Sequence, residues 1–172
     1  IIDSDFDAGN TEFLDSEGNS RVLTYPEFTG NGNSHGTLVA EIITGNTIGV
    51  ASGITVRGVS AGTTCADGTP KCISVQRKMY ETLYNDGVRI FNQSFGSEDM
   101  ITTKTTSDMP LSDNVVSFYF TRALSDSLFI LAAGNGTGFV GNSAVGVEAG
   151  LPYLYPSMEQ GWLAVVAVDN TD

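Results

Sequence analysis

Short apolar runs that alternate with helical patterns constrain the fold of this chain more than any other feature of its sequence. The runs are rich in β-branched residues and too short to cross a membrane, as is typical of buried strands, and they cover residues 1–2, 54–59, 88–93, 128–133 and 162–168. Helical patterns cover residues 34–44, 73–85 and 112–125. This alternation predicts an α/β fold around a mostly parallel sheet, with functional side chains beyond the carboxyl ends of the strands.

The helix predicted over residues 34–44 is amphipathic and should pack its apolar face into the core. That face comprises Leu38, Val39, Ile42 and Ile43. Gly87 follows the second helical pattern and should end that helix. The polar, glycine-rich or threonine-rich segments 7–33, 97–110 and 134–156 are expected to be loops.

Composition favours one domain and argues against two classes of partner. The 172 residues are 41% hydrophobic, which is enough for one core. The formal net charge of −12 repels nucleic acid and anionic membranes, so partners should be neutral or cationic. The sequence has no leader and no apolar stretch of about 18 residues. Since it opens directly on the strand-like Ile1-Ile2, we expect a piece of a longer protein.

The two cysteines, Cys65 and Cys72, enclose the turn-rich segment CADGTPKC. With no third cysteine and a single histidine, a small disulfide-closed loop explains them better than a metal site does. A disulfide favours a location outside the cytoplasm; the alternative is a pair of free thiols.

Three polar residues occupy places where an α/β fold exposes functional groups. Asp3 follows the first strand, and Asn135 lies between two glycines after the strand predicted over residues 128–133. His35 follows Ser34, a good N-cap, and would lie in a first helical turn whose positive end favours the neutral imidazole. An acid, a base and an amide that donates to an oxyanion are the groups that acyl transfer requires. Each residue alone also fits a turn, a cap or a core position.

The segment Ser94-Phe95-Gly96 adds a feature of peptide recognition. It closes the strand predicted over residues 88–93 with small residues and a backbone edge along which an extended peptide could pair as an added strand. Taken alone, the segment is equally a loop.

These motifs, in this order, resemble those of the subtilisin-like serine proteases, the subtilases. IIDSDFD is similar to the family's aspartate motif, NSHGTLVAEIITG to its histidine helix, FNQSFGS to its substrate strand, LFILAAGNGTG to its oxyanion motif and WLAVVAVDN to the next strand. The resemblance implies a three-layer subtilisin-like fold, truncated at its C-terminus, of which residues 1–172 form the N-terminal and central part of one catalytic domain.

Carried over residue by residue, the resemblance assigns roles in peptide hydrolysis. Asp3 would orient the histidine, His35 would be the general base and Asn135 the oxyanion donor. Ser94-Phe95-Gly96 and Ala132-Ala133-Gly134 would form the walls of a cleft for a peptide or protein substrate.

A narrower resemblance points to the subtilase passengers of bacterial autotransporters. It rests on LPYLYPSMEQGWLAVVAVD and the close cysteine pair. It implies a secreted or cell-surface location, with a membrane-anchored β-barrel following the protease in the longer protein.

The sequence departs from the subtilase pattern at two motif positions. Asp5 replaces the family's glycine and is a rival carboxylate to Asp3, and Leu38 replaces its second histidine. Of the family's calcium loops, only residues 46–50 show a faint resemblance. We therefore expect no cofactor, and calcium binding has no support in the sequence.

The family's nucleophile motif, Gly-Thr-Ser-x-Ala, does not occur in the 172 residues. We therefore expect the serine to lie outside this piece, so that the piece alone should be inactive and should self-associate through apolar surface. Two alternatives remain: a non-catalytic, degenerate subtilase module, and an α/β-hydrolase esterase with Ser60 in Gly58-Val59-Ser60-Ala61-Gly62 as its nucleophile. The order of Ser60 and His35 along the chain disfavours the esterase.

Overall fold

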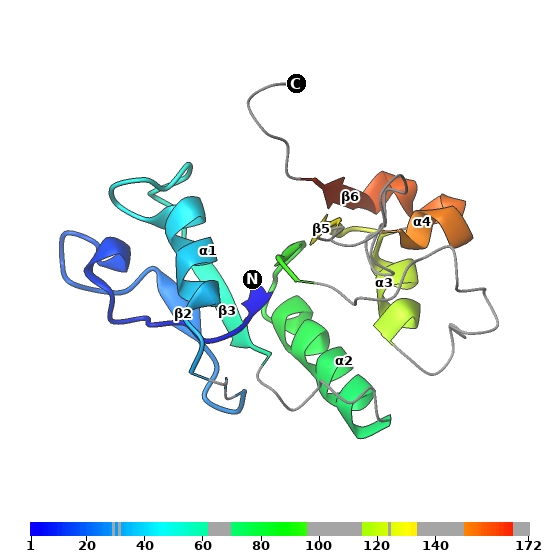
Figure 1. The fold of residues 1–172 in the computed structure, drawn as a ribbon, viewed down its shortest axis with the longest axis horizontal. Coiled ribbons are helices and arrows are strands. Elements are labelled where there is room, and N and C mark those ends of the chain that lie inside the picture. The colour runs from blue at the N-terminus through cyan, green and yellow to red at the C-terminus, as the bar shows by residue number, and fades with distance from the viewer. Residues whose placement is uncertain are drawn as a thin grey trace, which may run out of the picture. The chain divides into compact units, whose positions relative to one another are not determined.

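The computed structural model describes residues 1–28, 30, 32–61, 70–95, 115–123, 125–133 and 150–166. Its helices and strands belong to two units, residues 1–88 and residues 89–172 (Figure 1). Within each unit the strands pair in parallel, with helices between them in the chain. This architecture confirms the predicted α/β class and is that of a subtilisin-like fold.

In the first unit, β1 (Ile2–Asp3) and β2 (Val22–Thr24) both pair with β3 (Val56–Ser60), which lies between them. The helix α1 (His35–Thr44) contacts β1 and β3. Ala40 of α1 belongs to a buried hydrophobic cluster together with Ile1, Phe13, Val22 and Val56. Phe13 ends the 3-10 helix η1 (Thr11–Phe13).

The second helix of this unit, α2 (Pro70–Asn85), ends where the sequence predicts. Gly87 has a φ of +87°, and its N–H donates to the Tyr84 carbonyl at 3.0 Å. Only glycine adopts this left-handed conformation without strain, so Gly87 is the predicted helix stop.

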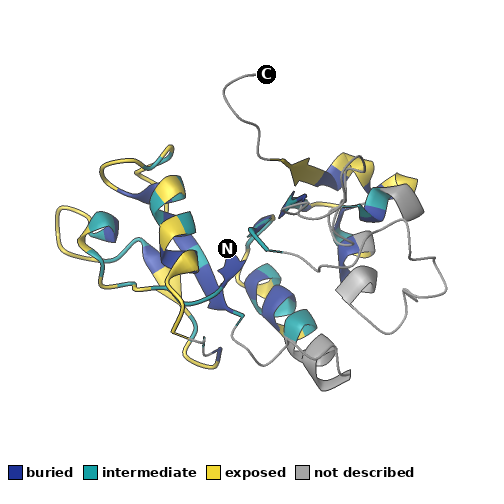
Figure 2. Ribbon diagram, viewed as in Figure 1, coloured by how far each residue is buried: buried dark blue, intermediate teal, exposed yellow. Residues whose placement is uncertain are grey.

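The helix α1 packs a different face from the one predicted. Its buried residues are Gly36, Thr37, Ala40 and Thr44. Val39 and Ile43 are partly buried against the core, and Leu38 and Ile42 are 54% and 58% exposed. Figure 2 shows exposed positions, in yellow, at several turns of α1. The prediction of one large apolar face was wrong because the small residues let the helix backbone approach the first strand and its turn closely.

In the second unit, β5 (Leu128–Ala132) lies between β4 (Ile90–Gln93) and β6 (Trp162–Val165). The helix α3 (Val115–Ala123) contacts β5, and α4 (Leu151–Leu154) and the 3-10 helix η4 (Pro156–Gly161) precede β6. Aromatic rings fill the core. Phe91 stacks on Phe129 with centroids 4.9 Å apart, and Tyr119 meets both Phe129 and Trp162 edge-on at 5.1 Å.

The predicted strands and helices are present with shorter or shifted ends. Within segments expected to be loops, the structure adds η1, β2 and α4. Burial was overestimated in β4 and β6, since Ile90 of β4 and Leu163 and Val165 of β6 are exposed. None of the described helices is both long and apolar enough to cross a membrane.

Candidate active site

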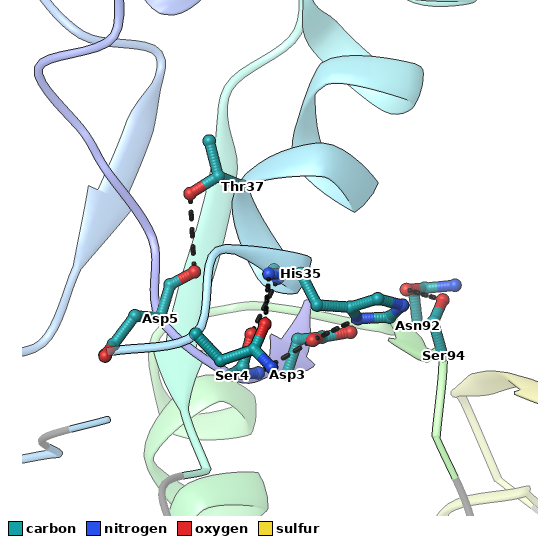
Figure 3. A network of polar contacts seen from close by, with 9 residues as sticks. Asp3, Ser4, Asp5, His35, Thr37, Asn92 and Ser94 are labelled. Atoms are coloured by element: carbon teal, nitrogen blue, oxygen red, sulfur yellow. Dashed lines mark hydrogen bonds and ion pairs between the residues drawn. The ribbon is translucent and has the colours of Figure 1, made fainter. Parts of the chain in front are cut away.

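Asp3 and His35 come from different elements and meet through a hydrogen bond. Asp3 is the last residue of β1, and His35 is the first residue of α1. The imidazole Nδ1 lies 2.7 Å from Oδ1 of Asp3 (Figure 3). Because the carboxylate accepts this hydrogen bond, the proton of the neutral ring is on Nδ1, and Nε2 can accept another. The pair therefore has the geometry of a base and the acid that orients it.

Burial makes Asp3 a fixed partner for the imidazole. Its side chain is 2% exposed, whereas that of His35 is 51% exposed. Oδ1 also accepts the N–H of Ser4 at 2.7 Å, and Oδ2 is buried with no hydrogen-bond partner among the described residues. A negative charge so poorly solvated interacts strongly with a neighbouring positive charge. The carboxylate should therefore stabilise an imidazolium when one forms.

The turn after β1 also holds the start of α1. The first three amides of the helix are bound in order by the Asn33 side chain at 2.8 Å, the Ser4 hydroxyl at 2.9 Å and the Asp5 carbonyl at 3.1 Å. Ser34 occupies the N-cap position, but its side chain makes no capping hydrogen bond. The turn that follows the acid thus also fixes the helix that carries His35. Sequence reasoning missed this role of Ser4.

The close approach of this turn to α1 requires glycine at position 36. A Cβ atom on Gly36 would lie 2.9 Å from the Asp5 carbonyl oxygen and 3.1 Å from the ring of Phe6. The Asp5 carboxylate itself points elsewhere and accepts the N–H of Gly32. Of the two rival carboxylates, it is therefore Asp3 that is hydrogen-bonded to the imidazole.

The described residues among those predicted to line a substrate cleft lie in the second unit. Ser94 and Phe95 follow β4, and the Ser94 hydroxyl donates to Oδ1 of Asn92 at 3.1 Å. Ala132 is the last residue of β5, and the N–H of Ala133 donates to the Val165 carbonyl at 2.8 Å. These four predicted positions thus lie at the carboxyl ends of two neighbouring parallel strands.

The remaining predicted site residues lie outside the described part of the chain. They are Gly96, Gly134, Asn135 and Cys65, together with the side chain of Cys72.

Ser60, the alternative nucleophile, is the last residue of β3 and lies beside Asp3 in the sheet register. It is buried, and within the described residues no hydrogen bond joins it to His35. A nucleophile elbow must present its hydroxyl to the substrate. The burial of Ser60 argues against that role.

The loop after α1, which resembles a calcium loop of the family, does not fit a metal ion. The guanidinium of Arg21 donates to the carbonyl oxygens of Glu12, Leu14 and Thr44 at 3.1, 3.0 and 3.0 Å, and to Oδ1 of Asn46 at 2.7 Å. Calcium prefers oxygen ligands of this kind, but here the guanidinium of Arg21 already binds these oxygen atoms. The described residues also contain no cluster of three or more His, Cys, Asp or Glu that could hold a metal.

Comparison with known proteins gives one result that covers the whole chain. The sequence matches the family model described as the Subtilase family over residues 1–172, and therefore across both units. No curated protein matches the chain. The family match agrees with the parallel α/β architecture and with an aspartate and a histidine that are hydrogen-bonded. The chain belongs to the subtilase family of serine proteases.

Proposed function

We propose that the chain supplies the acid and the base of an Asp-His-Ser triad in a subtilisin-type endopeptidase. The hydrogen bond of 2.7 Å between Asp3 and His35 is the observation that carries the proposal. In the general triad mechanism, the serine passes its proton to Nε2 of His35 as it attacks the peptide carbonyl. Asp3 holds the ring and stabilises the imidazolium, and His35 then protonates the leaving amine.

The oxyanion and substrate roles complete this proposal. Asn135 donates to the oxyanion, while Ser94-Phe95-Gly96 and Ala132-Ala133-Gly134 line the cleft for an extended peptide. Their support is the resemblance to family motifs and the position of the described members after β4 and β5. Replacing Asn135 by alanine should lower kcat roughly 10²- to 10³-fold, with little change in KM, because the amide acts on charge that develops in the transition state.

The nucleophile comes from outside the 172 residues, since they contain no Gly-Thr-Ser sequence. A polypeptide limited to these residues, which form part of one catalytic domain, should therefore show no peptidase activity. The resemblance of residues 151–169 to autotransporter passengers further supports a secreted or cell-surface protease, in which Cys65 and Cys72 form a disulfide.

The test uses the protein that contains these residues together with the nucleophile segment. Replacing Asp3 by asparagine should lower kcat about 10⁴-fold, as in other triads, because the wrong tautomer of His35 is then favoured. Asp5→Asn is the matched control, since the Asp5 carboxylate binds the N–H of Gly32 and not the imidazole.

Two results would contradict the proposal. One is an equal loss of kcat in the Asp3 and Asp5 variants. The other is labelling of Ser60 by a serine-directed fluorophosphonate, which would favour the esterase alternative.

A further inference from the structure

A buried amide at the end of β4 connects the segment after this strand to α3. The side chain of Gln93, which is 4% exposed, donates from Nε2 to the carbonyl oxygen of Phe95 at 3.3 Å. Its Oε1 accepts the hydroxyl of Tyr119 at 3.1 Å. Tyr119 lies on α3 and is 3% exposed. A chain of two hydrogen bonds therefore runs from α3 through Gln93 to the backbone at Phe95.

The ring of Tyr119 is well placed to act as a rigid support. Its centroid lies 5.1 Å from those of Phe129 and Trp162, with interplanar angles of 71° and 72°. Edge-to-face contacts on two sides favour a single ring orientation. The hydroxyl, and with it the amide of Gln93, is thereby held in one place.

Two polar groups in an aromatic core call for a physical reason. A buried amide or hydroxyl costs free energy unless it is hydrogen-bonded, and an apolar side chain would fill the same space without that cost. Here the two groups bind each other and one backbone carbonyl. The hydrogen bond to the carbonyl of Phe95 restricts the orientation of the backbone at that residue.

We propose that Gln93 and Tyr119 are positioning residues that hold the backbone after β4 in the orientation that an extended peptide substrate needs. The inference rests on the proposed function, in which a substrate pairs with this backbone as an added strand. Such pairing depends on main-chain hydrogen bonds, so it requires peptide units of fixed orientation. Neither side chain touches the substrate; both act through Phe95.

The test compares two substrates of the active protein that contains this chain. A tetrapeptide amide reaches along the strand, whereas an ester of a single amino acid does not. Tyr119→Phe should lower kcat/KM for the tetrapeptide roughly 3- to 10-fold, the effect of losing one buried hydrogen bond, mainly through a higher KM. Hydrolysis of the ester should change less than about twofold. Tyr25→Phe is the matched control, because it removes a tyrosine hydroxyl that binds Asp86 instead of Gln93.

A second variant keeps the test decisive if Tyr119→Phe folds poorly. Gln93→Met combined with Tyr119→Phe replaces both partners by apolar groups of similar shape, which can be nearly neutral for stability. This variant should show the same selective loss on the tetrapeptide. Equal losses on both substrates, or no loss in either variant, would overturn the inference alone. An unmodified protein that hydrolyses neither substrate would overturn the proposed function and this inference with it.

Discussion

Replacing Ser4 by alanine should destabilise the start of α1, although Ser4 lies 32 positions before its partner. The Ser4 hydroxyl accepts the N–H of Gly36 at 2.9 Å, and Gly36 is buried. Loss of a helix-capping side chain costs about 1 kcal/mol, and a buried amide without an acceptor costs about 1–3 kcal/mol. We expect the free energy of unfolding to fall by about 1–2 kcal/mol. Each kcal/mol should lower Tm by about 2–8 °C for domains of this size range.

The control for this change is Ser34→Ala. Ser34 occupies the N-cap position, but it is exposed and its side chain makes no capping hydrogen bond, so its loss should stay within about 0.5 kcal/mol. Urea unfolding followed by circular dichroism gives both values, and Ser4→Thr, which keeps a hydroxyl, should recover part of the loss. A larger loss for Ser34→Ala than for Ser4→Ala would refute the reasoning.

Four further results are expected. Adding EDTA should leave Tm unchanged, because the guanidinium of Arg21 already binds the oxygen atoms that a metal ion would need near the loop after α1. A fall in Tm on chelation would contradict this. Burial, helped by a hydrogen bond to a carboxylate, raises the pKa of Tyr25 to about 12, so its contribution to stability should be complete below about pH 10 and lost by about pH 12. The free energy of unfolding of the unmodified chain and of Tyr25→Phe, measured as a function of pH, checks this prediction. A difference between the two that does not change with pH would contradict it. The 172-residue polypeptide should self-associate, and Leu38→Lys should weaken this because it charges the exposed face of α1; light scattering that returns an 18.2 kDa monomer for the unmodified chain would be the opposite result. Under oxidising conditions, Cys65 and Cys72 should make the intact chain two hydrogens lighter by mass spectrometry, whereas two alkylated thiols would disprove the loop disulfide.

The sequence predicted those parts of the fold that depend on local pattern. Apolar runs bounded by turn formers located β3, β4, β5 and β6, because burial between layers requires continuous apolar residues. The strand β2 was missed, since its three residues are defined by pairing with β3 and not by a pattern of their own. Helical spacing likewise could not decide which face of α1 is buried, because that depends on which neighbour approaches most closely.

The same division holds for the candidate site. The proximity of Asp3 and His35 could be predicted, since Asp3 ends a recognisable strand and His35 begins a recognisable helix. The roles of Ser4 and Arg21 could not, because each binds partners far away in the sequence. Ser34 shows the reverse error: it is the right residue at the right position, but its hydroxyl makes no capping hydrogen bond.

The turn that caps α1 makes two backbone amides into reporters of the site. Gly36 and Thr37 donate to Ser4 and Asp5, so their N–H groups are protected from solvent exchange only while the turn and the helix remain together. Local opening that moves the turn away from the start of α1 must release these amides. Hydrogen exchange at these two positions would therefore measure how often the turn after Asp3 and the helix that carries His35 come apart. Since it needs no turnover, the measurement does not depend on the nucleophile.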